Sequence, residues 1–333
     1  MGENKYLYAV TRIRSLENKL LDKTKIDRMV EAKNSEEVIK VLYETDYAGS
    51  ISEVDNIEDY ETFLAKELEN TYALVKEIAP EPELIEIFLL KYDIHNLKVL
   101  LKSHFLNEEH DHLLTGVGTI APAKLKEMIR ERDFVDLNPI IRNALEEIIN
   151  SFSVYPDPQI IDLILDKCLY QLMNNIVTKS KNDFLKTFVR MQIDLNNIKM
   201  FVRIKAIGYQ RDFLKKAFIE GGSLDYGFFS DAMDDPVDSL IDKLAMSDYS
   251  NVVAEGLGDY SKTKSLMRFE KLSDDFLLNY VKKGKYVAFG IEPIVGYIMA
   301  KENEAKLIRI IMVGKINHME NEVIRERLRD VYV

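Results

Sequence analysis

An eleven-residue pattern occurs three times in this chain, and it constrains the fold more than any other feature of the sequence. The three copies read YDIHNLKVLLK at 92–102, IDLNNIKMFVR at 193–203 and NEAKLIRIIMV at 303–313. Each copy places an acid three residues before an Asn or Leu, which is followed by Leu or Ile and then by Lys or Arg. The residues that define the pattern are Asp93, Asn96, Lys98, Asp194, Asn197, Lys199, Glu304 and Arg309. The third copy is looser, because Leu307 replaces the Asn.

A second pattern accompanies each copy. It is a short amphipathic segment that ends in Asp and an aromatic residue, at 38–47, 125–134 and 240–249. Two elements in the same order, three times, indicate a triplicated unit. Units of about 110 residues are longer than tetratricopeptide or armadillo repeats, whose periods are about 34 to 47 residues, so they are the size of domains. We therefore expect three similar helical domains, at 1–106, 107–220 and 221–333.

The rest of the chain is predicted to be helical as well. Apolar residues recur at intervals of three and four, and alternation with a period of two is scarce. Three prolines follow a residue that can cap a helix, at Asn138–Pro139, Asp157–Pro158 and Asp235–Pro236. This order matches an N-cap followed by the first helical residue, where the missing N–H of proline costs nothing. The sequence therefore predicts an all-α fold.

Asp93 and Asn96 are unusual because they lie among leucines on a predicted helix. On a helical wheel they fall between two apolar arcs, away from a strip of lysines, so they must find hydrogen-bond partners inside the protein. One interpretation is an ion or proton site. The other is a polar brace to a neighbouring element, repeated because the domain is repeated. We favour the brace, since a catalytic site is normally unique in a chain whereas a packing device recurs with its fold.

The composition argues against several classes of function. The formal net charge of −11 disfavours a nucleic-acid or anionic-lipid binder, because both ligands require a basic surface. Cys168 is the only cysteine and is expected to be buried, so no internal disulfide can form and a reducing, cytoplasmic setting fits. The most apolar run, 286–300, is interrupted by Glu292 and Pro293 and is shorter than the ~20 residues of a membrane helix. We expect no membrane span.

Few motifs suggest catalysis or ligand binding. His110, Asp111 and His112 form one metal-like cluster, but the two histidines cannot share a helix face and no second group of ligands accompanies them. The Gly-x-Gly sequences at 116–118 and 256–258 follow no predicted strand and lack the rest of a dinucleotide fingerprint. The sequence also lacks a P-loop and a nucleophile elbow. We therefore predict no catalytic residue, no cofactor and no metal site.

The whole chain resembles a known family in its length, in the order of its elements and in three stretches of sequence. These are YLYAVTRIRSLENKLLDK at 6–23, VLYETDYAGSI at 41–51 and EAKLIRIIMVGK at 304–315. They are similar to the opening and to the first-domain and last-domain signatures of the C subunits of the prokaryotic V-type, or A-type, ATPases. The eukaryotic counterpart is the d subunit of the vacuolar ATPase. The resemblance implies a funnel-shaped protein in which the three domains are arranged with pseudo-threefold symmetry.

The resemblance also implies a function. A member of this family connects the central shaft, made of the D and F subunits, to the membrane rotor (proteolipid) ring. It carries rotation between the ATP-handling head and a ring that transports protons or sodium ions, and it is itself non-catalytic. It is peripheral, because the ring holds it at the cytoplasmic face of the membrane.

Two other functions are compatible with the sequence. The first is an unrelated all-helical scaffold that assembles another multi-protein complex. The second is a helical enzyme that uses Asp93 and Asp194 as paired acids, which requires a pocket where carboxylates converge. Copurification with a rotor ring would separate the connector from the scaffold.

Overall fold

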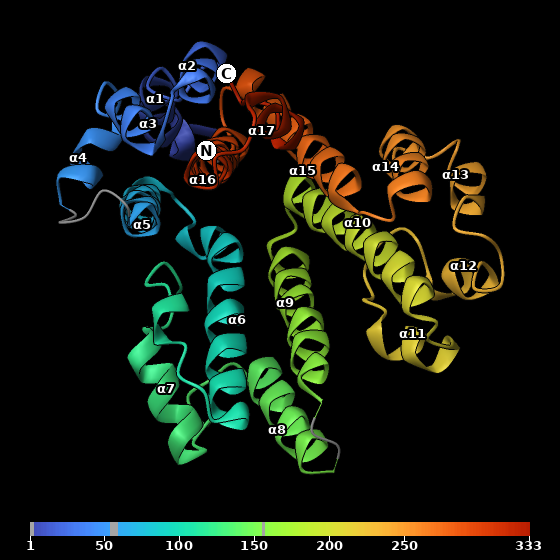
Figure 1. The fold of residues 1–333 in the computed structure, drawn as a ribbon. Coiled ribbons are helices and arrows are strands. Elements are labelled where there is room, and N and C mark those ends of the chain that lie inside the picture. Colours follow the sequence, from blue (N-terminus) through green and yellow to red (C-terminus); the bar gives the residue numbers. More distant parts are fainter. Residues whose placement is uncertain (1–2, 54–58, 155–156) are drawn as a thin grey trace. The chain divides into compact units, whose positions relative to one another are not determined.

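The computed structural model describes residues 3–53, 59–154 and 157–333, and every regular element in these ranges is a helix (Figure 1). The prediction of an all-α fold is confirmed. The α-helices are α1 (Leu7–Glu17), α2 (Lys23–Glu31), α3 (Ser35–Leu42), α4 (Tyr47–Ser52), α5 (Tyr60–Ile78), α6 (Pro82–Leu106), α7 (Pro122–Glu131), α8 (Pro139–Val154), α9 (Pro158–Ser180), α10 (Asp183–Ile207), α11 (Arg211–Ala217), α12 (Tyr226–Asp231), α13 (Ser239–Lys243), α14 (Ser250–Thr263), α15 (Met267–Lys282), α16 (Glu292–Ile316) and α17 (Asn321–Arg327). Short 3-10 helices are η1 (Glu3–Tyr6), η2 (Asp111–Leu113) and η3 (Lys283–Tyr286).

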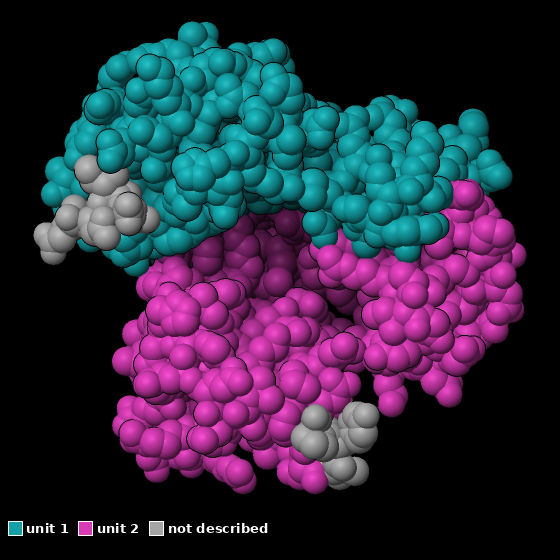
Figure 2. All heavy atoms as spheres, in the orientation of Figure 1, with its two compact units in different colours: residues 1–82, 241–333 teal, residues 83–240 magenta. Residues whose placement is uncertain are grey.

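The chain divides into two compact units (Figure 2). Unit 1 contains residues 1–82 and 241–333, and therefore both ends of the chain, whereas unit 2 contains residues 83–240. In unit 1, α1, α2, α3, α5 and α15 all pack on α16. In unit 2, α8, α10 and α11 pack on α9. The arrangement of three domains around a pseudo-threefold axis stays a prediction.

Three helices in the described ranges share a length of 25 residues, and each carries one copy of the repeated pattern. They are α6, α10 and α16. Their buried residues include consecutive positions, such as Phe88, Leu89 and Leu90 of α6, so each helix is apolar on more than one side. A helix of this kind lies inside a bundle and packs against several neighbours.

The second repeated pattern begins on the short helices α3, α7 and α13. In all three segments the aromatic residue is buried, whereas the Asp directly before it is exposed. The aromatic residues are Tyr47, Phe134 and Tyr249. The aliphatic residues four and eight positions before each Asp are also buried. Each segment therefore packs its apolar side inward and leaves its Asp in solvent.

Two of the three predicted proline starts are correct. α8 begins at Pro139 and α9 begins at Pro158. The prediction is wrong for Pro236, because α13 begins only at Ser239. The Nζ of Lys205 donates to the carbonyl oxygen of the residue before Pro236, at 2.5 Å. A carbonyl of this segment is therefore satisfied by a side chain rather than by a helical hydrogen bond.

Candidate functional site

The three acids of the repeated pattern lie near the middle of α6, α10 and α16, and all are buried. The exposed fraction is 1% for Asp93, 0% for Asp194 and 4% for Glu304. A buried carboxylate must be compensated by hydrogen bonds or by a cation, because it has lost its water shell. The three sites meet this need in two ways.

Asp93 binds the loop that leads into α7. Its Oδ1 accepts hydrogen bonds from the backbone N–H groups of Thr119 (2.8 Å) and Ile120 (3.0 Å), and its Oδ2 accepts one from the Thr119 hydroxyl (2.6 Å). Gly118 allows this close approach, because a Cβ there would lie 2.2 Å from Oδ1. Burial raises the pKa of Asp93, while the bonds from Thr119 and Ile120 act in the opposite direction. One loop thus replaces the water around this carboxylate.

Asp194 binds the loop that leads into α12 in the same way. Its carboxylate accepts hydrogen bonds from the N–H of Ser223 (2.9 Å), the hydroxyl of Ser223 (2.5 Å) and the N–H of Leu224 (3.0 Å). A Cβ at Gly222 would again lie 2.2 Å from the Oδ1 of the acid. The sequences Gly-Thr-Ile and Gly-Ser-Leu are therefore two versions of one carboxylate-binding segment. We call these segments the acid loops, residues 118–120 and 222–224.

Asn96 and Asn197 bind the backbone a few residues before the acid loops. The side-chain amide of Asn96 donates to the carbonyl oxygen of Thr115 (2.8 Å) and accepts from its N–H (3.0 Å). Asn197 makes the same pair of bonds with Ile219, at 2.8 and 3.0 Å. A side-chain amide that binds both the N–H and the C=O of one residue satisfies these backbone groups, as the backbone of a neighbouring strand would. Each Asp and Asn together hold a segment that follows their own long helix.

Glu304 is compensated by a buried group of charges. Its Oε2 accepts hydrogen bonds from Lys301 Nζ (3.0 Å) and the Tyr47 hydroxyl (3.0 Å), and Lys301 Nζ also lies 2.9 Å from Glu67. The same ammonium lies over the Tyr47 ring, 4.2 Å from its centre. Burial acts to lower the pKa of Lys301, but the surrounding acidic groups hold it well above its usual value. The lysine is therefore charged. We call Tyr47, Glu67, Lys301 and Glu304 the buried ion cluster.

The other oxygen of Glu304 binds the N-terminal part of the chain. Its Oε1 accepts a hydrogen bond from the N–H of Leu21, the residue directly before Asp22, which caps α2. Ile120 and Leu224 also stand directly before the N-caps of their helices, α7 and α12. All three acids thus bind the N–H of a residue that precedes a helix cap. For Glu304 that residue comes from the opposite end of the chain.

The bases of the pattern lie nearer the surface. The Nζ of Lys98 lies 2.7 Å from Asp166 on α9, and Arg309 donates two hydrogen bonds to Glu61 on α5, at 2.6 and 2.7 Å. Lys199 is half-buried at the corresponding place on α10. Ion pairs that remain in contact with water contribute about 0–1 kcal/mol each. The bases therefore matter less to stability than the buried acids.

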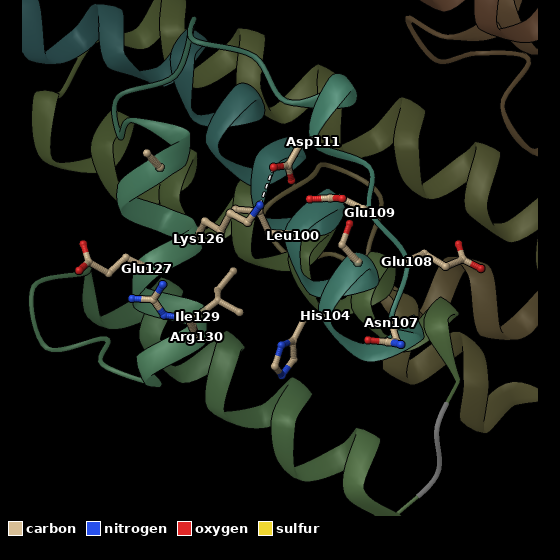
Figure 3. Close-up of a pocket in the computed structure, with 12 residues that line it drawn as sticks. Leu100, His104, Asn107, Glu108, Glu109, Asp111, Lys126, Glu127, Ile129 and Arg130 are labelled. Atoms are coloured by element: carbon tan, nitrogen blue, oxygen red, sulfur yellow. Dashed lines mark hydrogen bonds and ion pairs between the residues drawn. The ribbon is translucent and has the colours of Figure 1, made fainter.

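The histidine-containing segment lies beside a pocket of about 610 Å³ between α6 and α7 (Figure 3). His110 pairs with Glu108 at 2.9 Å, and Asp111 pairs with Lys126. Figure 3 shows Glu108 and Glu127 on opposite sides of this pocket, so its acids do not converge on one point. In the part of the chain that the structure describes, no group of three or more His, Cys, Asp or Glu is placed to hold a metal ion.

The buried acids are poorly placed for catalysis. A catalytic acid must reach a substrate, but neither Asp93 nor Asp194 lines the pocket between α6 and α7 or the pockets beside α9. Their hydrogen bonds are made within the fold. Cys168 is buried as predicted, and burial raises its pKa to about 12, so the thiol stays protonated and is a poor nucleophile. We propose that the acids are structural braces.

Comparison with known proteins identifies the family. Residues 9–327 match the family described as ATP synthase (C/AC39) subunit. The chain belongs to this family. It is 32% identical to the C subunit of the A-type ATP synthase of Methanocaldococcus jannaschii, over 97% of this chain and 86% of the relative. It is 27% identical to the C subunit of the V-type sodium ATPase of Enterococcus hirae, over 96% of this chain and 97% of the relative.

Membership of the C/AC39 family confirms the resemblance seen in the sequence and makes the chain part of an ATP synthase complex. The matched region includes all three copies of the repeated pattern and both acid loops. Within the described residues, no helix has both the length and the apolar character needed to cross a membrane.

Three parts of the braces in this C/AC39 protein were not foreseen from the sequence: the acid loops, Lys301 and Leu21. A signal for the loops exists, because Gly, then Thr or Ser, then an aliphatic residue ends two positions before a helix begins in both cases. Lys301 gives no such signal, since a lysine three residues before an acid usually forms an exposed pair on a helix. Only the fold brings Glu67 beside it.

Proposed function

We propose that this chain is the non-catalytic connector in the central stalk of a rotary V/A-type ATPase. It joins the D–F shaft of the ATP-handling head to the membrane rotor (proteolipid) ring, and it carries rotation that is coupled to proton or sodium transport. The observation that carries the proposal is the family match over residues 9–327, together with relatives that are C subunits of A-type and V-type ATPases by name. The ring holds the chain at the cytoplasmic face of the membrane.

The interior of the chain supports a mechanical role. A connector must transmit torque without deforming, and helices of 25 residues are rods about 37 Å long. The buried acids of the repeated pattern on these helices bind loops and the segments before helix starts, so they stiffen the body. The proposal includes three similar domains, at 1–106, 107–220 and 221–333, around a pseudo-threefold axis.

Reconstitution without this chain tests the proposal. The complex is assembled in vesicles with and without the chain, and ATP hydrolysis and ion uptake are followed together. We expect the head to hydrolyse ATP and the ring to remain embedded, with no ion uptake until the purified chain is added back. Coupled uptake in the absence of the chain would contradict the connector role.

The non-catalytic part of the proposal has its own test. The isolated chain, purified away from the catalytic head, is expected to hydrolyse no nucleotide with or without added divalent metal. Asp93→Asn provides the matched control, because it removes the buried acid of α6 and keeps a hydrogen-bond acceptor. ATPase activity that the wild-type chain shows and this variant lacks would support the enzyme alternative instead.

A further inference from the structure

The pocket between α6 and α7 has no role in the function proposed above. Figure 3 shows Leu100 and Ile129 at this pocket, and together with Ala123 they make part of its wall apolar. Bases and acids line the rest, including Lys126 and Glu127, so charge alone does not select an occupant. The surroundings of the other two long helices show what fits there.

The three long helices end alike, which allows their surroundings to be compared. Each is followed within two residues by a residue with positive φ, which is Asn107 after α6, Gly208 after α10 and His318 after α16. In all three cases the N–H of the next residue binds the carbonyl oxygen five positions before it. The helices α7, α12 and α2 also correspond, because each follows an N–H group that a buried acid of the pattern binds. Residues around the three helices can therefore be matched by counting.

The grooves beside α10 and α16 are filled by a short helix of the chain itself. The helix α11 packs on α10 and α12, and α17 packs on α16 and α2. Each short helix has seven residues, and the sixth residue after the one with positive φ, Leu214 or Ile324, is 0% exposed. A Cβ at Gly314 would lie 2.6 Å from the Ile324 side chain, so Ile324 packs directly on α16. A short helix with one buried aliphatic residue thus fills this position twice.

The α6–α7 pocket lies at the place that α17 occupies beside α16. The buried aliphatic residue of α17 contacts Gly314, and the counterpart of Gly314 on α6 is Ser103, which lines the pocket. Arg325 of α17 pairs with Asp27 of α2 at 2.5 Å, and the counterpart of Asp27 on α7 is Lys126, which also lines the pocket. The residues that hold α17 thus correspond to residues of an open pocket.

The segment after α6 leaves this groove open. It forms only the three-residue 3-10 helix η2, and none of these three residues is buried. Leu113 matches Leu214 and Ile324 in position, yet it is 49% exposed. The Nε2 of His95 donates a hydrogen bond to the carbonyl oxygen of Leu113 at 2.9 Å. The aliphatic residue that would fill the groove is therefore held elsewhere.

The length of this segment explains why it forms no filling helix. The two asparagines of the pattern bind Thr115 and Ile219, so these residues mark corresponding ends of the segments after α6 and α10. Ten residues, 209–218, lead to Ile219, and seven of them form α11. Only seven residues, 108–114, lead to Thr115, which is too few for a seven-residue helix with turns at both ends. A helix that fills this groove therefore comes from another protein.

We propose that the α6–α7 pocket binds a short helix of another subunit of the ATP synthase complex. The helix packs one aliphatic side chain against Leu100 and Ile129, as α17 packs Ile324 against α16. Insertion of an amphipathic helix into a groove is a common mode of protein recognition. Its helical form and its aliphatic residue define the occupant, whereas its charge does not, because Lys126 already pairs with Asp111. The proposal depends on membership of the complex and not on the connector role.

Filling the pocket tests the site. Ala123 is exposed and lines the pocket, so the side chain of Ala123→Trp is expected to occupy it. The full chain with this substitution is titrated against the ATP synthase complex that lacks this chain, and we expect at least a tenfold loss of affinity. Ala121→Trp is the matched control, since Ala121 is also exposed but does not line the pocket, and it should weaken binding less than twofold. Equal affinities of the two variants, both with a wild-type melting temperature, would overturn the proposal.

Crosslinking identifies the occupant. A photoreactive phenylalanine derivative replaces the exposed Glu127 at the pocket in the assembled complex, and the crosslinked peptide is identified by mass spectrometry. We expect a segment of another subunit that has helical apolar spacing and an aliphatic residue. A crosslink to a second copy of this chain, to lipid or to no other molecule would overturn the proposal. The crosslink is read in any complex that assembles, so its result is independent of ion uptake, which tests the connector role.

Discussion

The acid loops and the buried ion cluster hold carboxylates at similar places on helices of equal length, yet they do so with different chemistry. Asp93 and Asp194 accept hydrogen bonds from neutral groups of a loop. Glu304 shares a lysine with a second carboxylate and a tyrosine. The first arrangement loses hydrogen bonds when it is broken, whereas the second leaves uncompensated buried charge.

The difference follows from where the bound segment lies in the chain. Asp93 reaches Thr119, which is 26 residues away, whereas Glu304 reaches Leu21, which is 283 residues away. In the simplest polymer estimate, closing the longer loop costs about 2 kcal/mol more conformational entropy. The junction that joins the two ends of the chain therefore needs the stronger interaction, and a buried cation beside two carboxylates supplies it.

Lys301→Met should produce the largest effect, because it leaves the buried carboxylate of Glu304 and the partly buried carboxylate of Glu67 without a cation. We expect the free energy of unfolding to fall by about 3–5 kcal/mol, measured by urea denaturation at neutral pH. Arg309→Met is the control, since it breaks an exposed pair on the same helix and should cost about 0–1 kcal/mol. Equal losses in the two variants would show that the cluster is no stronger than a surface ion pair.

Asp93→Ala should lower the free energy of unfolding by about 1–3 kcal/mol, because the donors of its acid loop lose their acceptor inside the protein. Asp194→Ala should have a similar effect. Once folded, both variants should still assemble and support coupled turnover. A stable and fully assembled Asp93→Ala complex that cannot turn over would favour an ion or catalytic role for this acid.

Gly222→Ala should destabilise the chain by about 1–2 kcal/mol, because the new Cβ would overlap the carboxylate of Asp194. The same substitution in an Asp194→Ala background should cost less, and this double-mutant cycle measures the coupling. Gly258→Ala is the control. Its Cβ would meet nothing within 4 Å on α14, so it should stabilise the helix by about 0.5–1 kcal/mol. Additive losses at Gly222 and Asp194 would argue against the acid loop.

Asp275 on α15 extends the comparison to a buried acid that accepts a hydrogen bond from the N–H of Asp330 at 2.7 Å. Burial raises the pKa of Asp275 to about 6. The unfolded chain releases this proton near pH 4, whereas the native chain keeps it until about pH 6, so stability falls as pH rises through this window. Asp275→Asn removes the titration. Its stability relative to wild type should rise by about 2 kcal/mol between pH 4 and pH 7, and a constant difference would contradict the shift.

Local patterns predicted the long helices and the short segments, because apolar spacing and capping residues act over a few positions. Asp93 and Asp194 could be identified as unusual for the same reason. The long-range partners in the buried ion cluster could not be predicted, since Leu21 and Tyr47 meet Glu304, and Glu67 meets Lys301, only after distant parts of the chain pack together. The wrong prediction of a helix start at Pro236 has a similar origin. The side chain of Lys205, which is distant in sequence, binds the carbonyl oxygen of Asp235 in place of a helical N–H.

The rotation of this chain inside the working complex is the most direct test of its function as a connector. Met246→Cys gives a site for a biotin-linked bead, because Met246 is 99% exposed and the native Cys168 is 1% exposed and will not react. The complex is fixed to a surface through its head, and the bead is followed after ATP is added. We predict that the bead turns in steps with ATP hydrolysis. A bead that stays still while the head hydrolyses ATP and the shaft rotates would contradict the connector role.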